Sequence, residues 1–153
     1  MAIYLVQHGK SYAKEKDPEQ GLTPDGRSES MRMAELVASH HIPVAAIIHS
    51  GKKRALETAE IFREKLGGVT RFEKADGMNP GDDVIQFAGT LDPTKNEMYV
   101  GHLPFMERLV SYLVGCPTEK VVFKFQNAGV VCVDGGPEAG AWTIRWSLMP
   151  RLA

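Results

Sequence analysis

The chain has 153 residues, 43% of them hydrophobic and 24% charged, and a formal net charge of −1 from 18 basic and 19 acidic residues. A chain of this length fits one domain with its own core, and the composition excludes a disordered or fibrous protein. The near-zero charge offers no field that would draw in nucleic acid or an anionic membrane, so neither is expected as a partner.

Short runs rich in valine and isoleucine alternate along the chain with stretches of helical periodicity. This alternation is typical of βαβ units and predicts an α/β domain whose mostly parallel sheet carries helices on both faces. The turn-rich segment 134–137 favours an antiparallel pair at the end of the chain. In chain order, the strands are predicted at 3–6, 44–48, 98–100, 121–125, 129–133 and 142–146.

Thr23 followed by Pro24 indicates the start of the first helix. Threonine can cap free amide groups and proline tolerates the first helical position, so a helix is predicted from there to about Ser39. Its inner side is predicted to carry Met31, Ala34, Val37 and Ala38.

Two later helices end at a glycine. Apolar residues at helical spacing predict a helix over 54–66 that stops at Gly67, and another that starts near Pro104 and stops at Gly115. A short helix is expected over 82–88, within an irregular acidic stretch. No repeat or linker interrupts the chain, so one domain over 1–153 is expected.

The cysteines and the N-terminal apolar run bear on the compartment. Cys116 and Cys132 form no CxxC pair and are too few for a disulfide scaffold, so we interpret them as small buried hydrophobes in a reducing compartment. The run from Ala2 to Val6 follows no basic segment and is far shorter than a membrane span of roughly 18 apolar residues. We therefore expect a cytoplasmic protein without signal peptide or anchor.

Imidazole and cationic side chains follow three predicted strands at their carboxyl ends, where open α/β sheets bind ligands. These segments are residues 7–10, 49–54 and 101–104. Gly9 would let the backbone turn sharply and a ligand approach closely. The lysines and arginine of these segments supply positive charge, and the helix near Arg54 adds the positive end of its dipole. The pattern predicts an anion site, with phosphate as the natural ligand.

Each of these side chains also has a structural interpretation. A single histidine is most often a hydrogen-bonded structural residue, which applies to His8, His49 and His102 taken one at a time. Lys52 and Lys53 are more often solvated surface charges. The sequence contains no HExxH motif, Cys/His cluster, Walker A loop, GxSxG elbow or glycine-rich dinucleotide loop, so neither a metal nor a cofactor is expected.

Four motifs in this order resemble the histidine phosphatase superfamily. They are His8-Gly9-Lys10, the Leu-Thr-Pro-Asp-Gly of 22–26, the segment 50–58 and Gly101-His102-Leu103-Pro104. In its short length and in the motif around His102, the chain is similar to the phosphohistidine phosphatases of the SixA type. The resemblance spans nearly the whole chain and implies a three-layer α/β/α fold of the phosphoglycerate mutase kind.

The resemblance also implies roles for individual residues. His8 would be the nucleophile, forming a phosphohistidine intermediate on phosphohistidine or a small phosphorylated substrate. Arg54 would clamp the equatorial oxygens, and His102, protonated while the phosphoryl group is bound, would donate a further hydrogen bond. The substrate-binding residues would be Gln7, Gly9, Lys10 and Lys52. We expect a monomer, since no coiled-coil seam or long apolar edge demands a partner.

Position 7 departs from the Arg-His-Gly motif of the family, because this chain has Gln7. Glutamine keeps an amide donor but loses the charge and the bidentate fork. A charged hydrogen bond contributes roughly 1.5–3 kcal/mol against about 1 kcal/mol for a neutral one. The difference corresponds to a loss of about five- to thirtyfold in rate or affinity, unless Lys10 or Lys52 compensates.

The general acid is unassigned as well. Asp76, Asp82 and Asp83 are candidates for the mouth of the site, although solvated loop charges are the commoner role of such residues. Two rival functions stay open. Gln7 favours a catalytically weak phosphate- or phosphohistidine-binding module, whereas a phosphomutase is disfavoured because the short chain has little left to enclose a substrate.

Overall fold

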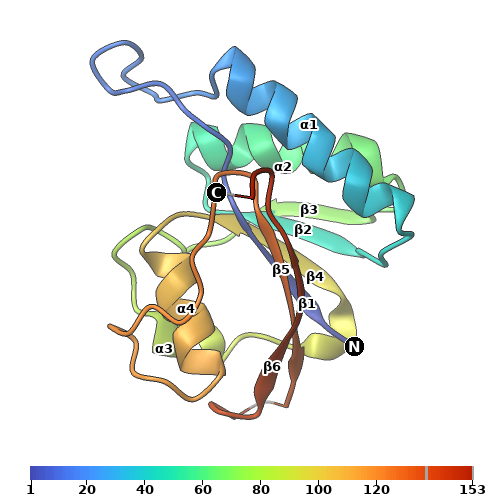
Figure 1. Cartoon of the computed structure of the whole chain (residues 1–153), viewed down its shortest axis with the longest axis vertical. Helices are drawn as coiled ribbons and strands as arrows, with labels where there is room; N and C mark the ends of the chain where they lie inside the picture. The colour runs from blue at the N-terminus through green and yellow to red at the C-terminus, as the bar shows by residue number, and fades with distance from the viewer. Residues whose placement is uncertain (137, 153) are drawn as a thin grey trace.

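A six-stranded sheet forms the centre of the protein, as the computed structural model in Figure 1 shows. The structure describes residues 1–136 and 138–152, so Pro137 of the predicted turn lies outside the described residues. The strand order is β3-β2-β4-β1-β5-β6, in which the first four run parallel and β5 and β6 run antiparallel. The predicted mostly parallel sheet is confirmed. The strands are β1 (Ile3–Gln7), β2 (Ala46–His49), β3 (Arg71–Lys74), β4 (Glu97–Gly101), β5 (Val130–Gly135) and β6 (Trp142–Leu148).

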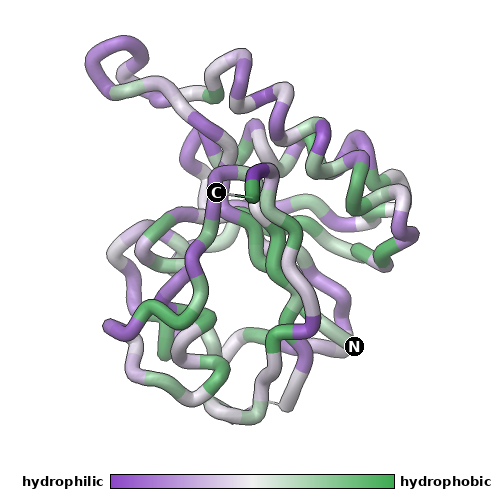
Figure 2. The backbone as a smooth tube through the Cα atoms, viewed as in Figure 1, coloured by the Kyte–Doolittle hydropathy of each residue, from purple (hydrophilic) through white to green (hydrophobic). Residues whose placement is uncertain are grey.

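Helices cover both faces of this sheet, giving three layers (Figure 1). Helices α1 (Pro24–Ser39) and α2 (Lys53–Leu66) pack on one face, and α3 (Val84–Ala88) and α4 (Phe105–Leu113) on the other. Alternate residues of β1 therefore enter two separate apolar clusters: Ile3 and Leu5 face α3 and α4, whereas Tyr4 and Val6 face α1 and α2. Figure 2 shows the central strands as mostly hydrophobic and the outer side of α1 as mixed with hydrophilic residues.

The predicted helix starts and ends are confirmed where a cap specified them. Thr23 Oγ1 accepts from the Gly26 amide at 3.0 Å, and Gly67 follows α2 with a φ of 67°. The inner face of α1 is partly wrong, however, because Met33 is buried and Met31 is 40% exposed. Both methionines lie at helical spacing from Ala34 or Val37, so periodicity alone does not separate them.

The predicted strand over 121–125 is wrong. No strand forms there, and Val121 and Val122 are 49% and 38% exposed. The Phe125 amide donates to Glu107 Oε2 of α4 at 3.1 Å, and the Phe125 ring packs against the cluster on that face. The segment therefore supplies apolar side chains to the core from an irregular backbone, while β5 takes the place beside β1.

Strand β3, in contrast, was not predicted, because its sequence contains no apolar run. It lies at the edge of the sheet, and of its four residues only Phe72 is half-buried, the others being exposed. Charged edge strands protect a sheet from further pairing, but they lack the alternation that marks a strand in sequence. Cys132 is buried in β5 as expected, whereas Cys116 is only half-buried, and both are free thiols.

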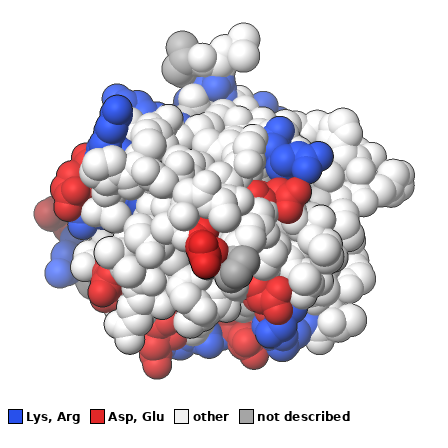
Figure 3. Space-filling model, turned by 90° about the horizontal axis from the view of Figure 1, so that it is seen from below, with Lys and Arg blue, Asp and Glu red and all other residues white. Residues whose placement is uncertain are grey.

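Charged side chains are distributed without a dominant sign on the face seen from below in Figure 3. Lys and Arg are interspersed there with Asp and Glu, mainly along the left and lower margins of the view, in keeping with the small net charge. None of the described helices is long and apolar enough to span a membrane.

Candidate active site

The carboxyl ends of β1 and β4 bring two histidines together. These strands pair in parallel with Gln7 opposite Gly101, so the next residue of each strand emerges at the same edge of the sheet. The His8 amide donates to Gly101 O at 3.0 Å, and the ring centroids of His8 and His102 lie 5.1 Å apart. The two candidate imidazoles are therefore neighbours, as the strand-end argument predicts.

The His8 ring is held so that one nitrogen is free to react. Its Nδ1 lies 2.7 Å from the carbonyl oxygen of Gly9, which accepts a hydrogen bond only from a protonated Nδ1. Nε2 then carries the lone pair. Burial lowers the pKa of His8 to about 4, the Gly9 bond opposing and the Arg54 charge reinforcing the shift. At neutral pH the ring is thus uncharged, the form that a nucleophile requires.

The second imidazole is oriented by a serine at the end of β2. Ser50 Oγ lies 2.5 Å from His102 Nε2 and accepts from the Lys52 amide at 3.4 Å. The Ser50 hydroxyl has no other acceptor among the described residues, so its proton is available for Nε2, and the proton of neutral His102 then lies on Nδ1. Burial, followed by the charges of His8, Arg54 and Lys52, lowers the pKa of His102 to about 3.

His102 Nδ1 is an unused donor in the part of the chain that the structure describes. It is buried and has no hydrogen-bond partner there, although buried polar groups in proteins are nearly always paired. A phosphoryl oxygen bound between the two histidines would supply the missing acceptor. Its negative charge would also raise the pKa of His102, which accommodates the expectation that this ring is protonated in the bound state.

Arg54 is the second residue of α2, and its charge lowers the pKa values of both histidines. Burial lowers the pKa of Arg54 itself. Thr58, one turn later, fixes this helix to the His8 loop: its Oγ1 accepts from the Gly9 amide at 2.9 Å and donates to Arg54 O at 2.8 Å. The structure therefore brings His8, Arg54 and His102 together at the ends of three elements.

Close packing against α1 requires a glycine at position 9, which the sequence alone did not indicate. A Cβ at this position would lie 2.5 Å from Ser30 Oγ and 3.0 Å from Gly26 O, so α1 leaves no room for a side chain. The Gly9 amide is already used by Thr58. Any contribution of Gly9 to ligand binding therefore rests on its small size.

The remaining predicted binding residues are Gln7, Lys52 and Lys10, and they differ in burial and in their contacts. Gln7 is buried, and its Oε1 has no hydrogen-bond partner among residues 1–136 and 138–152. Lys52 is exposed, yet its charge contributes to the lowered pKa of His102. Lys10 is connected through its backbone, since its carbonyl accepts from the Thr23 amide at the start of α1.

His49 fits its structural interpretation. It ends β2, and its Nδ1 accepts from the Gly51 amide at 3.1 Å, at a turn where Gly51 has a φ of +90°. Burial, with a smaller contribution from Lys74, lowers the pKa of His49 and so preserves Nδ1 as an acceptor. The residue shapes the turn that carries Ser50 and Lys52.

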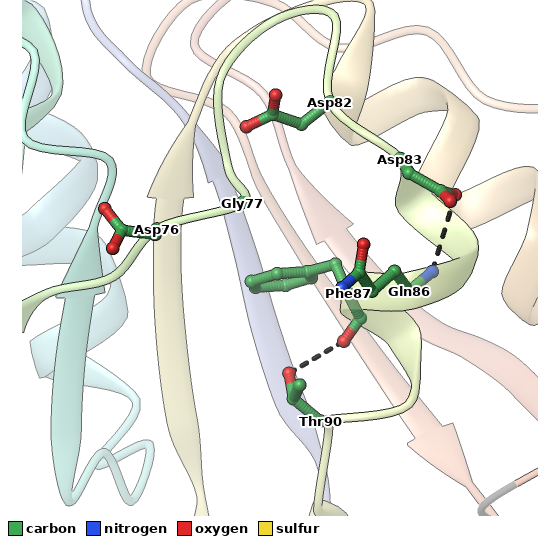
Figure 4. Close-up of a pocket in the computed structure, with 7 residues that line it drawn as sticks. All are labelled: Asp76, Gly77, Asp82, Asp83, Gln86, Phe87 and Thr90. Atoms are coloured by element: carbon green, nitrogen blue, oxygen red, sulfur yellow. Dashed lines mark hydrogen bonds between the residues drawn. The ribbon is translucent and has the colours of Figure 1, made fainter.

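The three candidate acids line one pocket of about 360 Å³, which Phe87 of α3 also lines (Figure 4). Two of them already stabilise the backbone: Asp83 Oδ1 caps α3 through the amides of residues 85 and 86, and Asp82 Oδ2 accepts from the Asn79 amide. These bonds favour the loop interpretation for Asp82 and Asp83. Asp76 is exposed on the opposite side of the pocket (Figure 4).

Ser50→Ala is expected to lower kcat/KM for the expected phosphate release about three- to tenfold. Without the Ser50 hydroxyl, neutral His102 would be a mixture of its two tautomers, and only part of it would carry the proton on Nδ1. Ser50→Thr, which keeps a hydroxyl, should retain most of the activity. Nitrogen NMR of the His102 ring separates this positioning role from a general structural one. A wild-type tautomer ratio in Ser50→Ala would contradict it.

Comparison with known proteins is consistent with this geometry. The sequence model of the histidine phosphatase superfamily (branch 1) matches residues 3–79. No curated protein sequence matches the chain. Among solved structures, the protein histidine phosphatase SixA complexed with tungstate is similar with a TM-score of 0.84 and 24% identity, over 98% of this chain and 97% of that one.

Two further structures share the same arrangement. A phosphohistidine phosphatase SixA of Agrobacterium tumefaciens, described as putative, has a TM-score of 0.79 and 21% identity over 97% of both chains. An alpha-ribazole-5'-P phosphatase of Escherichia coli, also described as putative, has a TM-score of 0.76 and 17% identity, over 95% of this chain and 94% of that one. At these identities the likeness establishes the fold, which is the phosphoglycerate mutase-like α/β/α architecture.

Proposed function

The chain belongs to the histidine phosphatase superfamily, and from this premise we propose that it hydrolyses phosphohistidine, or a small phosphorylated compound, through a phosphohistidine intermediate on His8. The observation that carries the proposal is the state of the His8 ring. Its Nδ1 is bonded to Gly9 O, and its lowered pKa leaves Nε2 unprotonated beside Arg54 and His102.

The reaction has two displacements at phosphorus. In the first, the lone pair of His8 Nε2 forms a bond to phosphorus while the bond to the leaving group breaks, and the leaving group takes the electron pair and a proton from solvent. In the second, water attacks phosphorus and loses a proton to solvent, the P–Nε2 bond breaks with its electron pair returning to Nε2, and inorganic phosphate leaves. Arg54 and His102 Nδ1 stabilise the charge on the equatorial oxygens throughout, and such positioning accounts for most catalysis of phosphoryl transfer.

A phosphoramidate such as phosphohistidine suits this site better than an alkyl ester. The leaving imidazole takes up a proton readily, whereas an alcohol needs a general acid. Asp82 and Asp83 are engaged in backbone hydrogen bonds and are therefore not assigned to that role. We therefore propose phosphohistidine as the preferred substrate, with the protein acting in the cytoplasm as a monomer.

Gln7 supports an alternative, a phosphate- or phosphohistidine-binding module with weak catalysis. The glutamine is buried beside Gly101, and the cationic fork of the family motif is missing from this position. Lys52 provides positive charge near His102 and supports retained activity. Phosphate release from a phosphohistidine peptide, measured against His8→Ala, distinguishes turnover from binding alone.

Gln7→Arg is expected to raise kcat/KM about five- to thirtyfold, because it restores a charged, bidentate contact to the phosphoryl oxygens. Gln7→Met, similar in size but without charge or amide, is the matched control and should lower activity. Steady-state phosphate release measures both. If Gln7→Arg binds phosphate more tightly but turns over no faster, the binding-module alternative is favoured.

A further inference from the structure

A groove of about 640 Å³ lies at the N-terminal end of α2. The loop after β1 forms one wall, and the first turn of α2 forms the other. Arg54 and Lys52 line this groove, and the charges of both residues act on His102. Because Arg54 is the proposed ligand of the phosphoryl oxygens, the groove reaches the proposed phosphoryl site at this residue, and its volume is much larger than a single phosphoryl group requires.

The charges that line the groove are mostly positive. They are Lys14, Lys52, Lys53 and Arg54, against the single carboxylate of Glu19. Glu19 Oε2 pairs with Lys53 Nζ at 3.4 Å, so these two charges offset each other. With Arg54 assigned to the phosphoryl group, Lys14 and Lys52 are left, and neither has an ion-pair partner within 4.0 Å among the described side chains.

The loop that carries Lys14 has a defined shape, although it projects beyond α1 (Figure 1). Ser11 and Leu22 form a β-bridge across its base, and the Tyr12 amide donates to Gly21 O at 2.9 Å. The Leu22 amide donates to Glu57 Oε1 of α2 at 2.8 Å. These bonds fix the base of the loop against the helix, so the backbone that carries Lys14 needs little further ordering when a ligand binds.

The opposite side of the sheet edge has the reverse charge. Asp76, Asp82 and Asp83 line the pocket near α3 (Figure 4). An anionic group attached to a bound phosphoryl donor would be repelled from that side and attracted toward the groove. The charge distribution therefore fixes the direction in which such a substrate lies.

We propose that the substrate carries a second anionic group, a carboxylate or a further phosphate, beside the phosphoryl group that is transferred, and that Lys14 and Lys52 bind this group. The proposal rests on the proposed function and specifies its substrate class. Two sources have the same chemistry: an acidic residue next to the phosphohistidine of a protein, or an acidic group within a small phosphorylated compound.

Two matched substrate pairs test the proposal. The first is a phosphohistidine peptide with glutamate on both sides of the modified residue, compared with the same peptide carrying glutamine. The second is phosphoglycolate compared with its amide. We expect kcat/KM to favour the acidic member about three- to tenfold in at least one pair, and the responding pair identifies the source. The preference should shrink in 0.5 M salt, because exposed charges are screened.

Variants with opposite expected effects make the test specific. Lys14→Gln should reduce the preference about two- to fivefold, whereas Glu19→Gln should increase it by a similar factor, because it frees Lys53. Lys16→Gln and Glu15→Gln remove the same charges from the same loop at positions that do not line the groove. These two controls should keep the wild-type preference.

The proposal is overturned if neither pair shows a preference, or if Lys14→Gln and Lys16→Gln behave alike. Absence of hydrolysis for all four compounds is a different outcome, since it removes the proposed function. In that case, calorimetry of the binding of the intact compounds tests the proposed role of the groove independently of hydrolysis. Tighter binding of the acidic members that is lost in Lys14→Gln supports the groove, and equal binding rejects it.

Discussion

His8→Ala is expected to lower phosphate release from a phosphohistidine peptide by about 10³-fold or more, because it removes the atom that forms the bond to phosphorus. The bond between His8 Nδ1 and Gly9 O holds the ring so that Nε2 is the nitrogen free to attack. His40→Ala, which alters an exposed histidine at the end of α1, is the matched control and should keep wild-type kcat/KM. Near-normal turnover by His8→Ala would assign the chemistry to another residue.

Arg54→Ala has the second largest expected effect, a loss of about 10²–10³-fold in kcat, because the phosphoryl oxygens lose their charged donor in the transition state. Arg54→Lys should recover part of this loss, since it restores the charge without the planar fork. Arg63→Ala, in the same helix with its guanidinium over the Phe72 ring at 4.9 Å, is the control. It should change kcat less than twofold.

The same variant also tests the electrostatics of the site. The Arg54 charge lowers the pKa of both His8 and His102, so Arg54→Ala should raise both values. Titration of the two rings by NMR measures the shift. Unchanged pKa values together with a large loss of kcat would mean that the guanidinium does not lie beside the imidazoles.

The parts of the fold that sequence predicts are those with local determinants. Thr23 and Pro24 specify the start of α1, and Gly67 specifies the end of α2, because caps act within one helical turn. Strand β3 and the segment 121–125 are decided by neighbours distant in sequence. An exposed charged run becomes a strand because β2 offers an edge, and an apolar run stays irregular because β5 already occupies the sheet.

A similar division applies to the candidate site. His8, Arg54 and His102 follow from the motif order, since each stands at a recognisable strand or helix end. The contributions of Ser50 and Thr58 depend on hydrogen bonds to residues 52 and 49 positions away, which no local pattern reveals. Both residues belong to the motif of 50–58, but their roles became apparent only from the contacts.

Around the candidate site, the positive and negative charges of the chain are separated in space. A net charge of −1 conceals a cationic groove beside α2 and an acidic pocket beside α3, on opposite sides of the same sheet edge. The expectation that neither nucleic acid nor an anionic membrane is a partner rests on the total charge, whereas the proposed choice of phosphorylated substrate rests on this separation.

The most direct test of the proposed mechanism is to identify the phosphorylated residue after rapid quenching with a phosphohistidine peptide. Intact mass and peptide mapping should find one phosphate on His8 that is labile in acid and stable in base, with no such adduct in His8→Ala. Turnover without any adduct at His8, or an adduct that persists in His8→Ala, would contradict a covalent route through this residue.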